Sequence, residues 1–489
     1  MDVGFAEPGR RAHLFMLSAS SAGHFFPCQQ LLYLLSAPPY VSRVTVTVAE
    51  IGIRIAELAD LKARGHFGSL DLRFEELLLP PPRQKVGKGP EDKNRQTISA
   101  FEPLKRKLQQ QKHNADAPTC IVSDMFFFFV QDLAEELRIP WYPMVPNNLR
   151  YTYACYLRTN PLLSSTDPEV RKRNLGPGLE FARVFDYPQD ILDRFDFMSV
   201  KCDRFLKSEA ILVNDVEAWD RDVGTHSALR DHFLSNASAH NTGKIPRVFY
   251  IGPLVNLAGF RLGPRTAFED SERPECLTWL GEQPSNSVLY IAFGSLHHHK
   301  QEALSELAYG LENSGVSFLW VLREYETMAS SLPAGFEDRC RGRGMIHKGF
   351  AAQTRILQHP SIGGFMSHCG WNSIIESICA GLPLITWPIC VDQPLNARFI
   401  VNGWKAGIGI KGSHEDYNSG VSREEVTRAI QTLMMSGDEG AEVRKNVLRL
   451  KSLAETAFKE GGSSFTALHS FAEEITSFQP NRPAIPETL

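Results

Sequence analysis

The sequence predicts an α/β protein of two domains, each built on a parallel sheet, that face each other across a cleft. The chain has 489 residues, and chains beyond roughly 250–300 residues usually divide into domains. Short apolar runs alternate with longer amphipathic runs, a pattern typical of parallel strands joined by helical crossovers. Residues 256–273, rich in glycine, proline and charge, interrupt the alternation and indicate a linker.

The short apolar runs are the candidate strands. Several are apolar throughout, as strands covered by helices on both faces are. Amphipathic runs between them, such as Ala303–Asn313 and Arg423–Met434, are predicted helices. The candidate strands are His13–Leu17, Val44–Val48, Leu72–Leu79, Cys120–Val122, Trp141–Val145, Ala210–Val213, Val248–Ile251, Val288–Phe293, Phe318–Leu322, Met345–His347, Gly364–Ser367 and Leu384–Trp387.

The interruption sets the expected domain boundaries. We expect an N-terminal domain at 1–254, a linker at 255–274 and a C-terminal domain at 275–460. Residues 461–478 are expected to form a helix that packs back on the N-terminal domain, and 479–489 to form a tail. Ligands of parallel sheets bind outside the carboxyl ends of the strands, so residues that directly follow strands are the first candidates for function.

Composition argues against several classes of protein. With 52 basic and 56 acidic residues the net charge is −4, without the basic excess of a nucleic-acid-binding protein. No stretch approaches the ~18 apolar residues that span a bilayer, and the apolar run after Arg10 and Arg11 is too short for a secretory signal. The nine cysteines form no C-x-x-C pair, which suits reduced thiols. We therefore expect a cytoplasmic protein.

Residues 350–393 carry the most information about function. Within them, Gly363–Ser367 reads as a buried strand, 368–370 as a turn, and a helix begins near Trp371. The start of a helix presents unpaired N–H groups and the positive end of the helix dipole. This position therefore suits a bound diphosphate.

Polar side chains surround the predicted helix start. His368, Asn372 and Ser373 can donate hydrogen bonds there, and Glu376, one turn later, can accept hydrogen bonds from ribose hydroxyls. Ser373 and Glu376 also match a capping box, in which both side chains only satisfy the helix end. A lone histidine such as His368 can equally be structural. The residues taken singly leave both interpretations open.

The segment as a whole resembles the signature box of the plant secondary-product glycosyltransferases, the UDP-sugar enzymes of glycosyltransferase family 1. It has the length of that box without insertion. The resemblance implies the family's GT-B fold, in which two Rossmann-like domains face each other across a cleft. The matching residues include His359-Pro360, His368, Gly370-Trp371-Asn372-Ser373, Glu376, Gly381, Pro383, Trp387-Pro388 and Asp392-Gln393.

The resemblance implies a part in donor binding for several residues of the box. A final glutamine in the box is similar to that of glucose-preferring members. By this likeness Phe350 stacks on the uracil, Ala351 and Gln353 contact the base and ribose, His368, Asn372 and Ser373 hold the diphosphate, Trp371 lines the sugar pocket, Glu376 binds the ribose, and Asp392 and Gln393 bind sugar hydroxyls.

A second donor element is similar to the family's Phe-Gly-Ser/Thr loop. It is the run Ala292–Ser295, which follows a candidate strand, and the likeness implies that Ser295 touches the diphosphate. A glycine–serine pair after a strand is also a common turn, so the residues alone do not decide.

Three positions depart from the family's pattern. Phe350 stands where the box usually has tryptophan, and Ala352 stands where it usually has proline. Because phenylalanine stacks on a base with less area than an indole, we expect weaker UDP binding. The family often has a small hydroxyl residue near Pro146 or Asn147, and this chain lacks it.

The candidate catalytic pair is His24 and Asp124. A hydroxyl that attacks a sugar needs a base, and a histidine with a pKa near neutrality suits that task. An aspartate on the other ring nitrogen fixes the tautomer and stabilises the imidazolium. Both residues follow candidate strands, although each could simply cap the next helix. The Gly23-His24-x-x-Pro27 pattern resembles the family's catalytic loop, which implies that His24 is the base and Asp124 orients it.

This likeness implies a direct displacement without a metal or other cofactor, which turns an α-linked UDP-sugar into a β-glycoside. Asp220-Arg-Asp222 matches a metal-binding Asp-x-Asp pattern literally, but it lies in a charged segment that we predict to be solvated surface. The adjacent residues His297–His299 do not converge easily on one ion. We therefore predict no metal site.

The acceptor is the least defined partner. The aromatic content suits a planar phenolic or flavonoid, and the block Phe126–Phe129 could line its pocket or belong to the core. Transfer to carbon rather than oxygen is an alternative on the same scaffold. Other classes are a UDP-sugar epimerase or hydrolase, which needs no acceptor, and a non-catalytic binding protein, which would not need His24 and Asp124. We expect a monomer.

Overall fold

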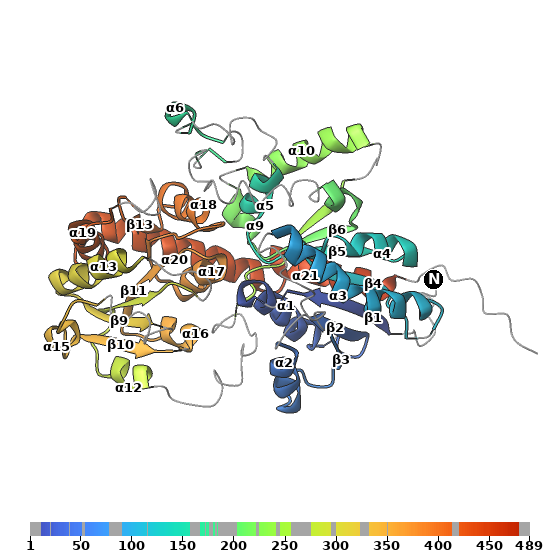
Figure 1. The fold of residues 1–489 in the computed structure, drawn as a ribbon, viewed down its shortest axis with the longest axis horizontal. Coiled ribbons are helices and arrows are strands. Elements are labelled where there is room, and N and C mark those ends of the chain that lie inside the picture. The colour runs from blue at the N-terminus through green and yellow to red at the C-terminus, as the bar shows by residue number, and fades with distance from the viewer. Residues whose placement is uncertain are drawn as a thin grey trace, which may run out of the picture.

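The computed structural model describes most of the chain as two α/β halves that lie side by side (Figure 1). The described residues are 11–19, 21–38, 40–50, 54–77, 90–114, 116–156, 167–171, 173–175, 179–180, 183, 203–221, 224–240, 245–255, 275–294, 300–322, 332–349, 351–412 and 420–478. Residues 256–274 of the expected linker and the expected tail, 479–489, lie outside them.

The N-terminal half is built on a seven-stranded parallel sheet with the strand order β3-β2-β1-β4-β5-β6-β7. The strand order reverses between β1 and β4, and this switch point is where doubly wound sheets bind ligands. The strands are β1 (Ala12–Ser18), β2 (Val44–Glu50), β3 (Asp71–Glu76), β4 (Cys120–Asp124), β5 (Trp141–Val145), β6 (Ala210–Val213) and β7 (Arg247–Tyr250).

The C-terminal half repeats this plan with six parallel strands in the order β10-β9-β8-β11-β12-β13. Its switch point lies between β8 and β11, so the segments that follow these two strands border the second binding crevice. The strands are β8 (Val288–Ala292), β9 (Ser317–Leu322), β10 (Gly344–Lys348), β11 (Ile362–Ser367), β12 (Leu384–Thr386) and β13 (Gly407–Gly409).

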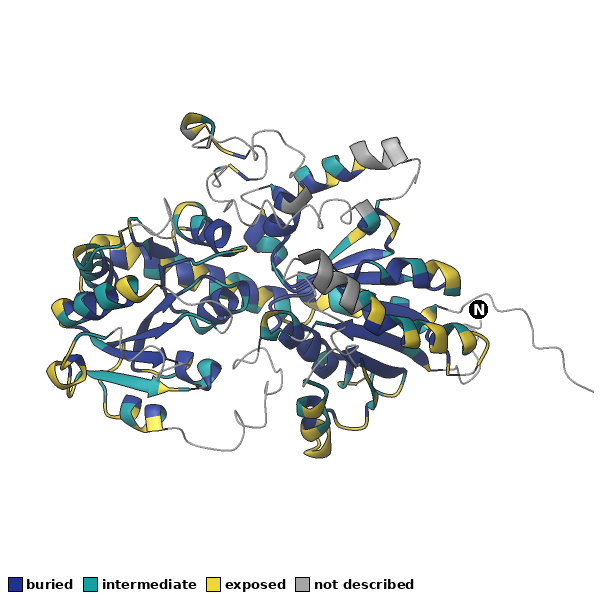
Figure 2. Ribbon diagram, in the orientation of Figure 1, coloured by how far each residue is buried: buried dark blue, intermediate teal, exposed yellow. Residues whose placement is uncertain are grey.

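Helices cover the faces of both sheets, so the central strands are buried along their whole length (Figure 2). The helices of the first half are α1 (Ala22–Leu35), α2 (Arg54–Ala63), α3 (Pro90–Gln110), α4 (Val130–Leu137), α5 (Leu149–Tyr156), α6 (Pro168–Arg171), α9 (Glu217–Asp220) and α10 (Thr225–His240), with 3-10 turns at Met125–Phe127 and Asp203–Lys207. Those of the second are α12 (Glu275–Gly281), α13 (Gln301–Ser314), α15 (Phe336–Arg339), α16 (Gln353–Leu357), α17 (Trp371–Ala380), α18 (Gln393–Arg398), α19 (Arg423–Met434), α20 (Asp438–Phe458) and α21 (Ser463–Ser477), with a π-helical turn at Phe399–Gly403.

The structure confirms the predicted α/β class. Each candidate strand is a strand whose ends shift by a few residues, and α13 and α19 lie at the predicted helices. The sequence analysis missed β13, because Gly407–Gly409 is three residues long and two of them are glycine. No helix among the described residues is long and apolar enough to cross a bilayer.

The last helix, α21, crosses from the second half to the first (Figure 1) and lies against β7 and β1. Phe471 and Ile475 are buried in the core of the N-terminal half. The Glu474 carboxylate accepts a hydrogen bond from the Tyr142 hydroxyl at 2.7 Å. The C-terminal helix therefore completes a face of the N-terminal sheet.

A buried polar and aromatic cluster joins the halves. The Arg150 guanidinium donates to Asp215 at 3.1 Å and to Asp220 at 3.3 Å, and it lies 4.9 Å from the ring centre of Trp404 and 5.6 Å from that of Trp371. The prediction of solvated surface is wrong for Asp220, which is 3% exposed, because its carboxylate is the partner of a buried guanidinium. Burial raises the pKa of Asp215 to about 6, although Arg150 opposes the shift.

Candidate active site

His24 and Asp124 meet at the switch point of the N-terminal sheet. His24 is in the first turn of α1, which follows β1, and Asp124 is the last residue of β4. The imidazole Nδ1 lies 2.7 Å from Asp124 Oδ2. Because an ionised carboxylate can only accept a hydrogen bond, Nδ1 carries the proton and the lone pair is on Nε2. The pair thus has the geometry of a base held by its orienting group.

Asp124 has two separate tasks. While Oδ2 contacts His24, Oδ1 accepts a hydrogen bond from the Phe126 backbone N–H at 2.9 Å. The carboxylate therefore also caps the turn at Met125–Phe127. Capping and orientation, which the sequence presented as alternatives, occur together, and the cap fixes the carboxylate against the imidazole.

The electrostatic surroundings of His24 favour its protonated form. Burial works to lower the pKa of His24, but the charge and hydrogen bond of Asp124, with a smaller contribution from Asp392, outweigh it and raise the pKa above its ordinary value. The side chain is 22% exposed and that of Asp124 is fully buried. This arrangement stabilises the imidazolium that forms when a base accepts a proton.

An aromatic ring covers one side of His24. The ring centre of Phe126 lies 4.5 Å from that of the imidazole, and the planes are 27° apart. Phe127 and Phe128, by contrast, are buried in the hydrophobic core, and Phe129 packs against it. The phenylalanine block is therefore largely core, and its first member borders the candidate base.

Helix α17 begins at Trp371, after the turn that follows β11. Its N-cap is Gly370, and no side chain caps it. The capping-box alternative for Ser373 and Glu376 is therefore wrong, because Ser373 already lies inside the first turn. A helix start without a side-chain cap leaves its backbone N–H groups to a ligand or to water.

Side chains expected to bind the base, the ribose and the diphosphate are hydrogen-bonded to one another. Gln353 Nε2 donates to Ser373 Oγ at 3.1 Å and to Glu376 Oε2 at 2.8 Å. Its Oε1 accepts from the Tyr290 hydroxyl at 3.2 Å. Ala351 is buried just before α16, the helix that begins at Gln353. The structure thus brings Gln353, Ser373 and Glu376 together in one cluster.

His368 is packed between two glycines. A Cβ atom on Gly294 or on Gly370 would lie 2.6 Å from His368 Nε2, closer than real contacts allow. Gly294 also has a φ of +76°, a region that residues with a Cβ rarely adopt. The turn after β8 and the turn after β11 can therefore converge around the imidazole only because both positions are glycine.

Asn372 links the helix start to the candidate base. Its Nδ2 donates to the backbone carbonyl of Gly23 at 3.0 Å, one residue before His24. The neighbouring Trp371 is buried, and its indole N–H donates to the Asn214 carbonyl at 2.6 Å. The Trp371 ring therefore lies in the core between the halves, and its contact with the sugar stays a prediction.

Asp392 lies beside the catalytic pair, and Gln393 supports the loop before it. Gln393 Oε1 accepts from the backbone N–H groups of Ile389 at 2.8 Å and Cys390 at 3.0 Å. Asp392 Oδ2 accepts a hydrogen bond from Asn396 Nδ2 at 2.6 Å. Burial raises the pKa of Asp392, and the neighbouring side chains of Asn147, Asn396 and His24 partly offset the rise.

Two candidate residues and one histidine run lie outside the described residues: Ser295, Phe350 and His297–His299. Across the described ranges, no group of three or more histidine, cysteine, aspartate or glutamate side chains could hold a metal ion. The expected roles of Ser295 and Phe350 rest on the resemblance alone, and those of the other site residues on the resemblance together with the geometry above.

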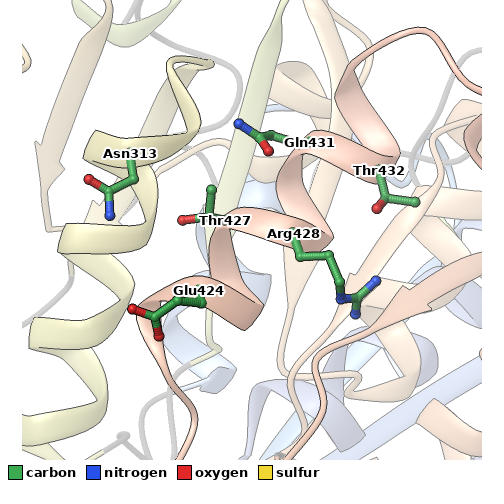
Figure 3. Close-up of a pocket in the computed structure, with 6 residues that line it drawn as sticks. All are labelled: Asn313, Glu424, Thr427, Arg428, Gln431 and Thr432. Carbon is green, nitrogen blue, oxygen red and sulfur yellow. The ribbon is translucent and has the colours of Figure 1, made fainter.

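A hollow of about 360 Å³ lies between α13 and α19, and none of the residues that line it is a predicted site residue (Figure 3). The Arg428 guanidinium beside it donates to Glu425 at 2.9 Å and to the Gly409 carbonyl at 3.0 Å. Its charge is therefore used within the fold, and we assign no ligand to this hollow. The lining residues are Asn313, Glu424, Thr427, Arg428, Gln431 and Thr432.

Comparison with known proteins identifies the family. The profile of the family described as UDP-glucoronosyl and UDP-glucosyl transferase matches residues 267–456. UDP-glycosyltransferase 73B3 of Arabidopsis thaliana is 30% identical over 96% of this chain and 100% of its own length. The chain belongs to the UDP-glycosyltransferases. This membership confirms the resemblance to the plant enzymes of glycosyltransferase family 1.

Solved structures confirm the GT-B fold of this glycosyltransferase. Medicago truncatula UGT71G1 complexed with UDP-glucose superimposes with a TM-score of 0.75 at 26% identity, over 96% of this chain and 99% of that one. A UDP-glucosyltransferase from Polygonum tinctorium capable of glucosylating indoxyl gives 0.78 at 26% identity, over 96% and 100%. The enzyme therefore transfers a sugar from a UDP-sugar to an acceptor, which removes the epimerase, hydrolase and non-catalytic alternatives.

The sequence analysis did not single out several residues that the glycosyltransferase places around its site. Asn214 accepts the Trp371 indole N–H through its carbonyl, and Asn148 and Asn396 meet across the halves at 2.7 Å. The sequence did hold a signal for Asn396. It follows Asp392 by four positions, and residues at that spacing share a helix face. Nothing in the sequence places Asn148 near it.

Proposed function

We propose that this enzyme transfers glucose from UDP-glucose to a hydroxyl of a small lipophilic acceptor, a phenolic or flavonoid, and gives a β-glycoside. The observation that carries the proposal is the 2.7 Å contact between His24 and Asp124, joined to the donor helix through the hydrogen bond from Asn372 to Gly23. The hydrogen bond from Asn372 to the Gly23 carbonyl thus connects the candidate diphosphate site with the loop that carries the candidate base.

In the proposed reaction His24 Nε2 takes the proton of the acceptor hydroxyl as its oxygen attacks the anomeric carbon. The bond from that carbon to the diphosphate oxygen breaks, and UDP leaves. Asp124 stabilises the imidazolium, and the N-terminus of α17 with His368 stabilises the departing charge. A single displacement inverts the anomeric centre, so an α-linked donor gives a β-product.

Three further features of the proposal concern the donor, the acceptor and the setting. Gln393 at the end of the box supports glucose as the donor sugar. Phe126 beside His24 and the indoxyl-glucosylating relative support an aromatic acceptor. We also propose that the enzyme acts in the cytoplasm as a monomer and without a metal, so that chelation by EDTA leaves its rate unchanged.

A product screen tests the proposal. Purified enzyme is incubated with UDP-glucose and a panel of phenolic, terpenoid and small-acid acceptors, with UDP-galactose as the matched donor control, and products are identified by mass spectrometry. We expect glucosides of phenolic acceptors whose anomeric coupling in NMR is that of a β-linkage and whose O-glycosidic bond is cleaved by acid. A preference for UDP-galactose would contradict glucose as the donor sugar, and an α-product would contradict inversion. An acid-stable C-glycoside would contradict transfer to oxygen.

A further inference from the structure

The Gly23-His24-x-x-Pro27 pattern contains a proline to which the proposed reaction gives no part. Pro27 is buried inside helix α1, four positions after Gly23. In an α-helix the N–H of each residue donates to the carbonyl four positions earlier. Proline has no N–H, and its ring clashes with that carbonyl. The Gly23 carbonyl therefore cannot take the hydrogen bond that a regular helix would give it.

The other half of the enzyme supplies a donor for this carbonyl. Asn372, the second residue of α17, donates from Nδ2 to the Gly23 oxygen at 3.0 Å. A flipped amide would set one acceptor oxygen against another, so the nitrogen is the atom that faces Gly23. The helix whose start is expected to bind the diphosphate thus bonds to the backbone beside the candidate base.

The peptide unit between Gly23 and His24 is held at both of its polar groups. The His24 N–H donates to the Ser21 carbonyl at 3.0 Å, and the Gly23 carbonyl accepts from Asn372. Because a peptide unit is planar, two hydrogen bonds at its opposite sides fix the orientation of the plane from which His24 extends.

The side chain of His24 is held separately. Its Nδ1 contacts Asp124 at 2.7 Å, and its ring stacks on Phe126 at 4.5 Å between centres. Both contacts come from the N-terminal half, whereas the bond to the Gly23 carbonyl comes from the C-terminal half. The backbone of the base is therefore anchored to the donor helix, and its imidazole to its own domain.

We propose that Pro27 and Asn372 are positioning residues for the base: Pro27 keeps the Gly23 carbonyl out of the helical hydrogen bonds, and Asn372 uses it to set His24 against the donor bound at α17. The inference rests on the proposed function, in which His24 is the base and α17 binds the diphosphate. The Asn372 amide has two N–H groups, so one can bond to Gly23 while the other faces the diphosphate.

The experiment replaces the proline. Pro27→Ala gives residue 27 an N–H, which can draw the Gly23 carbonyl back into the helix. The matched control is Pro103→Ala, since Pro103 also lies inside a helix of the same half, α3, on an exposed position. For each enzyme we would measure kcat at saturating UDP-glucose with an acceptor from the product screen, the Kd of UDP by calorimetry, and the melting temperature.

We expect kcat to fall roughly tenfold in Pro27→Ala, the order of change that one neutral hydrogen bond contributes. The Kd of UDP should stay within about twofold of the native value. The melting temperature should not fall, because the helix gains a hydrogen bond in place of the contacts of the ring. Pro103→Ala should keep the native kcat. Loss of activity without loss of stability is a result that a merely structural proline would not give.

A double-mutant cycle with Asn372→Ala tests whether the loss passes through the proposed bond. Asn372→Ala also removes an expected diphosphate contact, so kcat is compared at saturating donor within that background. We expect Pro27→Ala to change kcat there by less than about twofold, since residues that act through one bond are not additive.

Two results overturn the inference: native kcat in Pro27→Ala, or the full loss of kcat when Asn372 is already alanine. If Pro27→Ala loses stability, Pro27→Val restores the same N–H, fills more of the space of the ring and is held to the same two criteria. Failure of the proposed function looks different, because the native enzyme would then form no glucoside or His24→Ala would remain active.

Discussion

The candidate catalytic pair of the N-terminal half and the predicted donor box of the C-terminal half differ in what their polar side chains bond to. His24 and Asp124 already contact each other at 2.7 Å, in the arrangement that proton transfer requires. In the donor box, Gln353 donates to Ser373 and Glu376, the side chains expected to receive a nucleotide with it. The pair is preassembled, whereas the side chains of the box bond to one another, and we expect them to exchange these bonds for contacts with UDP-sugar.

This difference has a kinetic consequence. Damage to the preassembled pair should lower the rate of the chemical step and leave donor binding intact. Damage to the box should weaken donor binding first, since its contacts form on binding. Five variants, taken from the largest expected effect to the smallest, test this separation and the contact between the halves.

The largest effect is expected for His24→Ala. Loss of the base should lower kcat for oxygen acceptors on the order of 10⁴-fold, the upper range for general base catalysis, while the Kd of UDP stays unchanged. Product formation by mass spectrometry and calorimetry with UDP measure the two quantities. His113→Ala, on the exposed surface, is the control. Activity near that of the native enzyme would remove His24 from the mechanism.

The next largest effect is expected in the buried cluster of Arg150, Asp215 and Asp220 between the two halves of the enzyme. Arg150→Met leaves Asp215 and Asp220 buried without their cation, and breaking a buried pair in this way costs about 3–5 kcal/mol. Chemical denaturation should show this loss of free energy of unfolding. Arg341→Met, which breaks an exposed pair with Asp338, should change stability by ~0–1 kcal/mol. Equal effects of the two would show that the cluster does not hold the halves together.

Asp124→Asn should separate the two tasks of this carboxylate. The amide oxygen can still accept the Phe126 N–H and preserve the cap, but the negative charge at His24 is lost. We expect kcat to fall roughly 10²-fold with a melting temperature within a few degrees of the native value. A fall in stability that accounts for the lost activity would contradict the orienting role.

The same variant should move the pH profile. His24 must be neutral to accept a proton, so the rate falls as pH drops below the pKa of His24, which the native environment raises. Removing the Asp124 charge removes the main cause of that rise, and burial then lowers the pKa. The acidic limb of kcat/KM should therefore shift to lower pH in Asp124→Asn. If the acidic limb does not move, it reports the titration of a group other than His24.

In the donor box, Gln353→Ala should raise the KM for UDP-glucose roughly tenfold with little change in kcat, since the lost hydrogen bonds contribute about 1 kcal/mol or slightly more. Gln358→Ala, on an exposed residue just after the same helix, is the control. A fall in kcat at constant KM would break the proposed distinction between the two regions.

The smallest effect is expected for Phe350→Trp. An indole stacks on a base with more area than a phenyl ring, so the Kd of UDP should fall a few-fold while kcat is unchanged. Calorimetry with UDP measures the change. Unchanged or weaker affinity would show that this departure from the family's box does not limit donor binding.

The sequence predicted the parts of the molecule whose determinants are local. Continuous apolar runs identified the strands, and α17 begins at Trp371, where the glycine before it suggested a turn. Family likeness identified the donor box because its residues are contiguous. His24 and Asp124 are 100 positions apart. The alternation of strands and helices placed each of them after a strand, and family likeness paired them.

The failures at polar side chains share one physical cause, which is that the burial of polar groups is decided by distant partners. Asp220 looked solvated among charged neighbours, yet Arg150 holds it in the interior. Ser373 and Glu376 matched a capping box, yet Gln353 bonds both. The bridge from Asn148 to Asn396 spans two domains, and no local pattern reports such a pairing.

The position of α21 has a consequence for synthesis of the chain on the ribosome. Phe471, Ala472 and Ile475 complete the core of the N-terminal half, but they are translated more than two hundred residues after Leu254 ends that half. At about 5–20 residues per second, the delay is roughly 10–40 s. During that interval we expect the apolar face of the N-terminal sheet that α21 covers to stay exposed.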